Sequence, residues 1–431
     1  MVERSHVWMP FTHMQSAPPP LLVRRGRGAL LELEDGRQLV DCISSWWVTL
    51  HGHGEPAIAQ AIAAQAEELE QVIAAGFTHA PGEELAAALV RRLPGLLDRV
   101  FYSDNGSTAV EVALKVAVQH WRNRGDGGRT RFIAFSGAYH GDTFGAMSVG
   151  ARSPFTQAFG DLLFAVDFVD YPYTCREDAG VEEREARSLE QLRLLLEARA
   201  ESYAAVIIEP LVQGAGGMRL CREQFLQALQ GLVREYGLLT IYDEVLVAFG
   251  RCGALFACEK AGTEPDIICL AKGLTGGFLP LAVTACTDQV YASFMGEMPE
   301  ATLFHGHSYT ANPLGCAAAL ASLELLEARW EQVERIEAHH RAALAALADE
   351  PALTRARLCG TIAAVDLCLD EGGGSGQPSA ADLRARFLER GYLLRPLGRT
   401  VYMVPPFCIQ PEQLDGAYRC IREVAAALAA P

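Results

Sequence analysis

Residues 267–273 read IICLAKG, and residues 238–244 read LLTIYDE. In each stretch a short apolar run gives way to a charged residue, Lys272 in the first and Asp243 in the second. Short apolar runs of this kind are typical of strands that are buried on both faces of a parallel sheet. Ligands of open α/β sheets bind beyond the carboxyl ends of the strands. The sequence therefore predicts that Lys272 and Asp243 lie at one crevice.

Short apolar runs and helical patterns alternate on both sides of these two stretches. Such alternation predicts an α/β fold whose large domain has a mainly parallel sheet. From Asn312 onward, two long helical patterns lead into a mixed α+β tail. Strands are expected at residues 131–135, 205–208, 238–242, 267–270 and 281–285, and helices at 57–70, 83–92, 108–121, 222–236 and 411–429.

The length of the chain, 431 residues, allows one large domain and one smaller domain, each with its own core. An Asp35-Gly36 turn between two short apolar runs predicts a β-hairpin near the start of the chain. We expect a large cofactor-binding domain over residues 51–319. Residues 1–50 and 320–431 are expected to combine into a small α+β domain.

Charge and cysteine content limit the partners and the compartment. A formal net charge of −16 argues against nucleic acid or an anionic membrane as a main partner. The twelve cysteines form no C-x-x-C pair, which indicates free thiols in a reducing compartment. The first ten residues lack an apolar signal segment, and the apolar runs are too short to span a bilayer. We therefore expect a cytoplasmic protein.

Two segments could contact a bound cofactor. Residues 103–108 (SDNGST) precede an amphipathic helix, whose backbone N–H groups and dipole favour a phosphate. The alternative is ordinary helix capping by Ser107 or Thr108. Tyr139, in residues 138–143 (AYHGDT), could stack on a cofactor ring or could simply pack in a turn. Neither a Walker A motif nor a G-x-G-x-x-G motif is present, so nucleotide binding is disfavoured.

Two His-Gly-His triplets, at residues 51–53 and 305–307, have the look of metal ligands. Neither has a third ligand at a useful spacing, and we expect no metal site.

A lysine and an aspartate at neighbouring strand ends suit pyridoxal 5′-phosphate, because lysine condenses with its aldehyde and a carboxylate keeps its ring nitrogen protonated. Alone, both residues could equally be ordinary surface groups. Five blocks, in order and spacing, resemble the class III pyridoxal-phosphate aminotransferases, and the resemblance runs from about Trp8 to the C-terminus. The blocks are GSTAVEVALK (106–115), AYHGDT (138–143), IIEPLVQGAGG (207–217), YDEV…FGR (242–251) and LAKGLTGG (270–277).

Within this class the chain is similar to members that convert 8-amino-7-oxononanoate into 7,8-diaminononanoate in biotin biosynthesis. The resemblance implies a type I (aspartate aminotransferase-like) fold and a homodimer whose active site is shared between subunits. The blocks that carry it are WMPFT (8–12), SSWW (44–47), GFTH (76–79), YHGDTFGAMSV (139–149) and LRPLGRTVYMVPP (394–406).

The resemblance also implies roles for individual residues. Lys272 would hold the cofactor as a Schiff base and move the proton, and Asp243 would pair with the pyridinium nitrogen. Tyr139 would stack on the ring, with Glu209 and Gln213 close by. The phosphate would be bound by Gly106, Ser107 and Thr108, and by His307 and Ser308, of which Ser308 would come from the neighbouring subunit. The pocket for the keto acid and the amino donor would be formed by Phe11, Trp46, Trp47, Tyr139, Asp142, Gly306, Arg395 and Tyr402, with Arg395 binding the substrate carboxylate and Arg251 near the site.

Three positions depart from members that use S-adenosylmethionine as the amino donor. Phe11 stands where those members have tyrosine, His307-Ser308 replaces Pro-Thr, and Ala248 replaces a glycine. Either S-adenosylmethionine or lysine is therefore expected as the donor. The alternatives are an ω-amino acid or diamine transaminase, a pyridoxal-phosphate mutase, and a non-catalytic protein with this fold.

Overall fold

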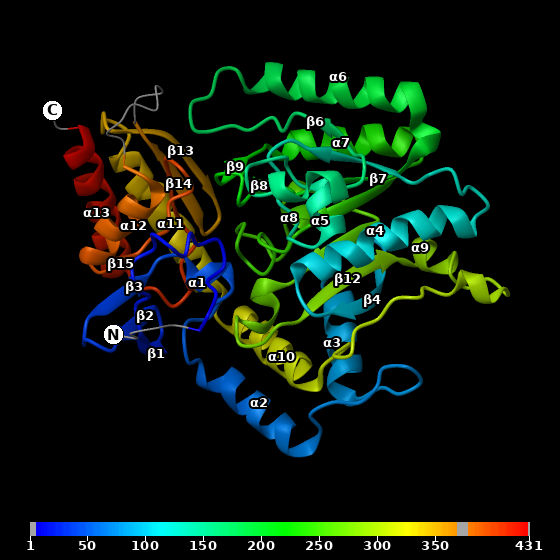
Figure 1. Cartoon of the computed structure of the whole chain (residues 1–431), viewed down its shortest axis with the longest axis horizontal. Coiled ribbons are helices and arrows are strands. Elements are labelled where there is room, and N and C mark those ends of the chain that lie inside the picture. The colour runs from blue at the N-terminus through cyan, green and yellow to red at the C-terminus, as the bar shows by residue number, and fades with distance from the viewer. Residues whose placement is uncertain (1–5, 369–377, 430–431) are drawn as a thin grey trace.

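The computed structural model describes residues 6–368 and 378–429. A seven-stranded sheet forms the centre of the fold (Figure 1). All its strands are parallel except β12, which is antiparallel to both of its neighbours. In spatial order the strands are β4 (Leu97–Ser103), β12 (Ala282–Thr287), β11 (Ile267–Leu270), β10 (Leu239–Asp243), β7 (Tyr203–Ile208), β5 (Arg131–Phe135) and β6 (Asp167–Val169).

Helices cover both faces of this sheet because its central strands are apolar on both sides. Ile207 of β7 packs in the cluster under α4 (Gly106–Asn123), whereas Val206 and Ile208 join the core on the opposite face. This alternation is the two-residue period of a strand. The other helices of this part are α2 (Pro56–Glu68), α3 (Ala80–Val90), α5 (Phe144–Val149), α6 (Val181–Arg199), α7 (Glu223–Glu235), α8 (Ala257–Ala261), α9 (Asp288–Ala292) and α10 (Pro313–Ala328).

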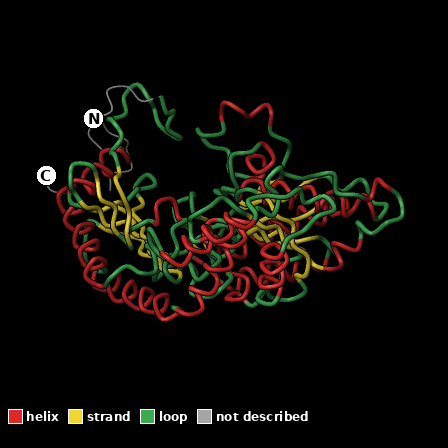
Figure 2. Tube along the Cα trace, turned by 90° about the horizontal axis from the view of Figure 1, so that it is seen from below, coloured by secondary structure: helices red, strands yellow, loops and turns green. Residues whose placement is uncertain are grey.

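The two ends of the chain meet in a second group of strands, which Figure 2 shows apart from the large sheet. The strand β15 (Tyr392–Leu393) pairs in parallel with β3 (Gln38–Asp41). This pairing supports the small domain proposed from both chain ends, while its limits at residues 50 and 320 stay a prediction. The other elements here are β1 (Val23–Arg27), β2 (Leu30–Leu33), β13 (Leu353–Cys359), β14 (Ile362–Leu367), β16 (Thr400–Met403), α1 (Ser44–Trp47), α11 (Trp330–Ala346), α12 (Ala380–Glu389) and α13 (Pro411–Ala429).

The predicted fold class is confirmed, and the five predicted strands are present. The sequence did not predict β4, β6 or α6. In β4 the charged pair Asp98-Arg99 interrupts the apolar run, as an edge strand permits. Most of the solvent-facing residues of α6 are charged, and they obscure the hydrophobic periodicity by which a helix is recognised in a sequence. Within the described part of the chain, no helix has the length and hydrophobicity that crossing a membrane requires.

Candidate active site

A cavity of about 430 Å³ lies at the carboxyl ends of β10 and β11. Since these strands are parallel neighbours, the residues that follow them meet at one edge of the sheet. Six residues that the sequence singled out line this cavity: Trp47, Gly106, Ser107, Tyr139, Asp243 and Lys272. Glu209, expected beside the cofactor ring, also lines it.

Lys272 lies just beyond the end of β11, and its backbone has a left-handed conformation with a φ of 46°. Its Nζ lies 4.5 Å from the centre of the Trp47 ring. Burial lowers the pKa of the Lys272 ammonium to about 8, although the carboxylates of Asp243 and Glu209 oppose the shift. About a tenth of this amine is therefore neutral at pH 7, far more than for a lysine with the ordinary pKa of 10.5, and the neutral form is the one that a nucleophile or a general base requires.

We expect the rate at which Lys272 reacts with added pyridoxal 5′-phosphate to rise with pH and to level off above about 8. Only the neutral amine attacks an aldehyde, and its fraction increases as pH passes through the pKa. Stopped-flow absorption after mixing cofactor-free protein with the cofactor measures this rate. A rate that stays constant across that pH region contradicts the assignment.

Asp243 is held by a histidine that the sequence did not single out. His140 Nδ1 lies 2.6 Å from Asp243 Oδ2, and the backbone N–H of Val245 donates to Oδ1 over 3.1 Å. Burial tends to lower the pKa of His140, but the hydrogen bond to Asp243 and the charge of its carboxylate raise it above the ordinary value. The only sequence signal for His140 is its position next to Tyr139.

Glu209 fixes the segment that carries Tyr139. One Glu209 oxygen accepts from the backbone N–H of Tyr139 over 2.9 Å, and the other accepts from Gly214 over 3.0 Å. Burial raises the pKa of Glu209 to about 7. The Tyr139 hydroxyl donates to Asp142 over 2.8 Å, which orients the ring at the cavity wall.

The start of α4 provides a small, backbone-lined end of the cavity. Gly106 has no room for a side chain, since a Cβ there would lie 2.7 Å from Val245 Cγ1. The Ser107 hydroxyl accepts from the backbone N–H of Asp142 over 3.2 Å. Exposed N–H groups at a helix start suit a phosphate.

Thr108 has the capping role that was left open as an alternative. Its hydroxyl donates to the carbonyl of Asn105 over 2.8 Å and accepts from the Asn105 N–H over 3.0 Å. Thr108 does not line the cavity. Its contact with a phosphate therefore stays a prediction without support from this geometry.

Aromatic residues pack together on the side of the cavity where the substrate is expected to bind, and they are called the aromatic wall below. Trp47 is buried and donates from Nε1 to the Tyr402 hydroxyl over 3.1 Å. The guanidinium of Arg395 lies 4.4 Å from the centre of the Trp46 ring. Phe11 packs edge-on against Trp46, with ring centres 5.8 Å apart. An apolar wall that ends in a cation fits a long aliphatic chain with a carboxylate.

This wall depends on strained backbone. Ser44, Ser45 and Trp47 have positive φ angles of 50°, 60° and 67°, which non-glycine residues rarely adopt. Buried Asp41 stabilises the turn by accepting from the N–H groups of Ile43 and Ser45 over 3.1 and 2.7 Å. The sequence analysis missed Asp41, because a strand-end aspartate resembles any turn residue.

Arg251 ties the same turn to the C-terminal part of the chain. It is fully buried and donates to Ser44 Oγ over 2.8 Å and to the carbonyl of Pro405 over 2.5 Å. Its burial lowers the pKa of the guanidinium to about 9. Arg251 thus positions the aromatic wall; it does not itself line the cavity, although its charge contributes to the lowered pKa of Lys272.

The segment around residue 307 lies outside the cavity of its own chain. His307 Nδ1 is 3.2 Å from Asp104 Oδ2, and Asp104 lines the cavity. Ser308 and Gly306 are exposed, and the carbonyl of Ser308 accepts from Gln71 Nε2 over 2.8 Å. The predicted contact of Ser308 with a partner's phosphate stays a prediction.

The two His-Gly-His triplets differ in their contacts. His51 lies 3.1 Å from Ser322 Oγ and His53 lies 2.8 Å from Asp41, so their rings serve different partners. His305 and His307 approach each other, with 3.2 Å between their Nε2 atoms. Over residues 6–368 and 378–429, no group of three or more His, Cys, Asp or Glu side chains is arranged to hold a metal ion.

Known proteins resemble this chain over nearly its full length. The family described as aminotransferase class-III matches residues 11–425. A relative from Synechococcus elongatus is 54% identical over 424 residues, which cover 98% of this chain and 99% of the relative. One from Geobacter sulfurreducens is 41% identical over 96% of this chain and 94% of its own length. Both are named adenosylmethionine-8-amino-7-oxononanoate aminotransferase.

Solved structures with the same fold include proteins with different named substrates. The aminotransferase of that name from Methanocaldococcus jannaschii has a TM-score of 0.90 at 34% identity, covering 99% of this chain and 98% of its own. An (S)-enantioselective omega-transaminase from Thermomicrobium roseum has a TM-score of 0.92 at 29% identity, covering 99% and 97%. A PLP-bound amine transaminase from an uncultivated Pseudomonas species reaches 0.87 at 30% identity, covering 99% of each chain.

Proposed function

Because the chain belongs to the class-III aminotransferases, we propose that it transfers an amino group to 8-amino-7-oxononanoate and forms 7,8-diaminononanoate in biotin biosynthesis. It is an aminotransferase, and its cofactor is pyridoxal 5′-phosphate. The observation that supports this substrate is the aromatic wall formed by Trp46, Trp47 and Tyr402, with Arg395 at its edge. Such a wall accommodates an aliphatic chain and anchors a terminal carboxylate.

The residues around the cavity fit the cofactor. Lys272 and Asp243 both reach the cavity, and the backbone-lined end at Gly106 and Ser107 suits a phosphate. Gln213, which was expected close to the ring, does not line the cavity, and its Oε1 is buried without a hydrogen-bond partner among the described residues.

The bound cofactor supplies an aldehyde that exchanges amino groups and a ring that withdraws electrons. Lys272 would hold the cofactor covalently, and its amine would take the proton from the donor and return it to the acceptor. Asp243, which is hydrogen-bonded to His140, would pair with the ring nitrogen. Tyr139 covers the ring, and Trp47 limits access of water to Lys272 Nζ. Amino transfer in two half-reactions gives ping-pong kinetics.

The identity of the amino donor is the finer part of the proposal. We propose S-adenosylmethionine or, because Phe11 lacks the tyrosine hydroxyl, lysine. Incubating the purified holoenzyme with 8-amino-7-oxononanoate and S-adenosylmethionine, lysine or glutamate, followed by mass spectrometry of the product, distinguishes these donors. Absence of 7,8-diaminononanoate with every donor refutes the proposed acceptor.

An ω-transaminase activity is the second candidate. The Thermomicrobium roseum omega-transaminase superposes with a TM-score of 0.92, so the backbone alone does not separate the two substrate classes. If a simple keto acid or aldehyde serves as the amino acceptor with the same kcat/KM as 8-amino-7-oxononanoate, this alternative is favoured.

We expect Arg395→Gln to raise KM for 8-amino-7-oxononanoate on the order of tenfold to a hundredfold, with a smaller change for a donor that lacks an equivalent carboxylate contact. A charge-assisted hydrogen bond contributes about 1.5–3 kcal/mol, which corresponds to this range. Steady-state kinetics with each substrate varied in turn measures the two KM values. Arg390→Gln, an exposed arginine on the same part of the chain, serves as the control. Equal increases in both KM values contradict the assigned role.

We also propose a homodimer in the cytoplasm, in which the segment at His307 and Ser308 completes the partner's site. The support is indirect: Phe304 and Tyr309 beside this segment are 78% and 63% exposed, as expected for apolar residues that a partner covers. All twelve cysteines are free, which agrees with a reducing compartment.

A further inference from the structure

A second cavity, of about 400 Å³, lies where the chain-end strands β13 and β16 face β9 (Arg219–Leu220) of the large part. Its charged residues are four arginines and one aspartate, a formal surplus of three positive charges in a chain with a net charge of −16. These residues are Arg219, Arg355, Arg357, Arg399 and Asp366, and Tyr173 and Thr174 complete the polar wall.

Arg357 and Asp366 have a structural role here. Arg357 is buried and donates to the carbonyls of Met218 and Gly217 over 2.8 and 2.7 Å. These hydrogen bonds join β13 to the part of the chain that contains the seven-stranded sheet. Its Nη2 also lies 2.8 Å from Asp366 Oδ1, and the Thr400 hydroxyl donates to the same oxygen over 2.8 Å. The one negative charge of the cavity is thus already neutralised by Arg357.

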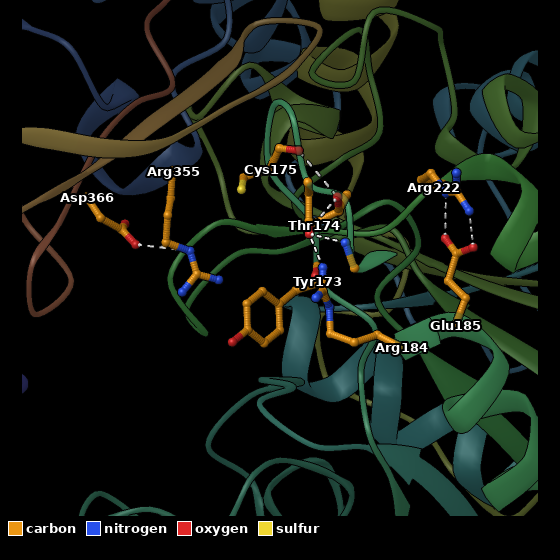
Figure 3. A network of polar contacts seen from close by, with 10 residues as sticks. Tyr173, Thr174, Cys175, Arg184, Glu185, Arg222, Arg355 and Asp366 are labelled. Atoms are coloured by element: carbon orange, nitrogen blue, oxygen red, sulfur yellow. Dashed lines mark hydrogen bonds and ion pairs between the residues drawn. The ribbon is translucent and has the colours of Figure 1, made fainter. Parts of the chain in front are cut away.

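Arg219 and Arg355 are less compensated than Arg357. The guanidinium of Arg219 lies 5.2 Å from the centre of the Tyr173 ring, and among the described residues it has neither a hydrogen bond nor an ion pair. Arg355 lies 4.8 Å from the same ring, and its Nε is 3.9 Å from Asp366 Oδ2, beyond hydrogen-bond distance. In Figure 3 the side chains of Arg355 and Arg184 lie on either side of Tyr173.

Arg184, like Arg219 and Arg355, lies close to the ring of Tyr173, but it does not line the cavity. It pairs with Asp178, and its guanidinium is 5.8 Å from the Tyr173 ring. The hydrogen bond and the charge of Arg355, with Arg219 and Arg184, lower the pKa of the Tyr173 phenol despite its partial burial. A tyrosine with a lowered pKa marks a region of positive potential.

We propose that this cavity binds a small multivalent oxyanion of the phosphate or polycarboxylate type. Arginine forks match such oxyanions in a bidentate way. The side chains of Arg219, from β9, and Arg355, from β13, both line the cavity, and of the two, among the described residues, only Arg355 has an ion pair, a long one with Asp366. The bound anion would bridge these two strands. It would also act close to the catalytic cavity, because a Cβ at Gly137, two residues before Tyr139, would lie 2.5 Å from Arg219 Nη1.

Calorimetric titration of the cofactor-loaded enzyme with inorganic pyrophosphate and, separately, with citrate tests the proposal. We expect one site per chain for at least one of these probes. Arg219→Gln and Arg355→Gln should each weaken binding by about tenfold or more, the effect of losing one charge-assisted contact. A preference for pyrophosphate identifies a phosphate site, and a preference for citrate identifies a carboxylate site.

Two control variants make the result specific. Arg187→Gln removes an exposed arginine of α6 that pairs with Glu183, and binding should be unchanged. Arg395→Gln alters the proposed carboxylate site of the substrate cavity, and binding should again persist. The proposal is overturned if neither probe binds, if Arg187→Gln weakens binding as much as Arg219→Gln does, or if Arg395→Gln abolishes it. Retained cofactor absorption in each variant shows that it is folded.

Discussion

Lys272→Ala is expected to lower turnover by about 10⁴-fold and to abolish the covalent attachment of pyridoxal 5′-phosphate. In the proposed reaction Lys272 both binds the cofactor aldehyde and moves the proton, so one substitution removes both functions. Its amine is buried beside Trp47, and no other lysine lines the cavity. Single-turnover assays and the visible absorption of the purified variant measure the two losses.

The chain has three lysines, Lys115, Lys260 and Lys272, so the lysine that holds the cofactor can be identified among few candidates. Borohydride reduction of the wild-type holoenzyme, followed by peptide mass spectrometry, should place the cofactor on Lys272 alone. Lys115→Ala is the matched control, because Lys115 contacts His305 and lies outside the cavity. Label on Lys115 or Lys260, or a Lys272→Ala variant that keeps its turnover, would falsify the assignment.

Asp243→Asn is expected to reduce kcat by on the order of 10²–10³-fold, with little change in stability. The amide is nearly isosteric, yet it carries no charge and no longer keeps the ring nitrogen of the cofactor protonated. It also removes the charged partner of His140, whose pKa should fall because only the charge of Glu209 would then oppose the effect of burial. Steady-state kinetics and the cofactor absorption spectrum report the two effects.

The control for Asp243→Asn is Asp98→Asn, which changes an exposed aspartate of β4 that pairs with Arg99. It should leave kcat unaltered. If Asp243→Asn keeps more than about a tenth of wild-type kcat, the pairing with the ring nitrogen is wrong, since loss of a preorganised charge costs more than this. His140→Asn should give an intermediate effect, because it leaves the carboxylate in place.

Sequence reasoning predicted the parts of the site that depend on local patterns. Strand-end positions put Lys272 and Asp243 on parallel neighbours, and β10 and β11 do pair in the sheet. It could not predict Asp41 or His140, whose importance lies in hydrogen bonds to particular backbone and side-chain atoms. The contact between Arg251 and Ser44 joins residues 207 positions apart, a separation that no local pattern reports.

The arginine-lined cavity illustrates the same limit. Arg219 and Arg355 are unremarkable in the sequence, and each becomes unusual only when β9 and β13 bring them to the ring of Tyr173. Thr108 shows the converse. A threonine at a helix start fits both a phosphate contact and a cap, and only the atomic distances decide which role its hydroxyl has.

The parallel pairing of β15 with β3 brings together the two chain ends, which carry Trp46 and Arg395, while Lys272 and Asp243 come from the middle. The aromatic wall with Arg395 and the reacting groups are therefore encoded in separate stretches of the gene. Mutations that retune which molecule is accepted can accumulate at the termini without disturbing the reacting groups. A chimera that exchanges both termini together between two relatives should exchange their preferences, whereas a swap of one terminus should disrupt the shared sheet.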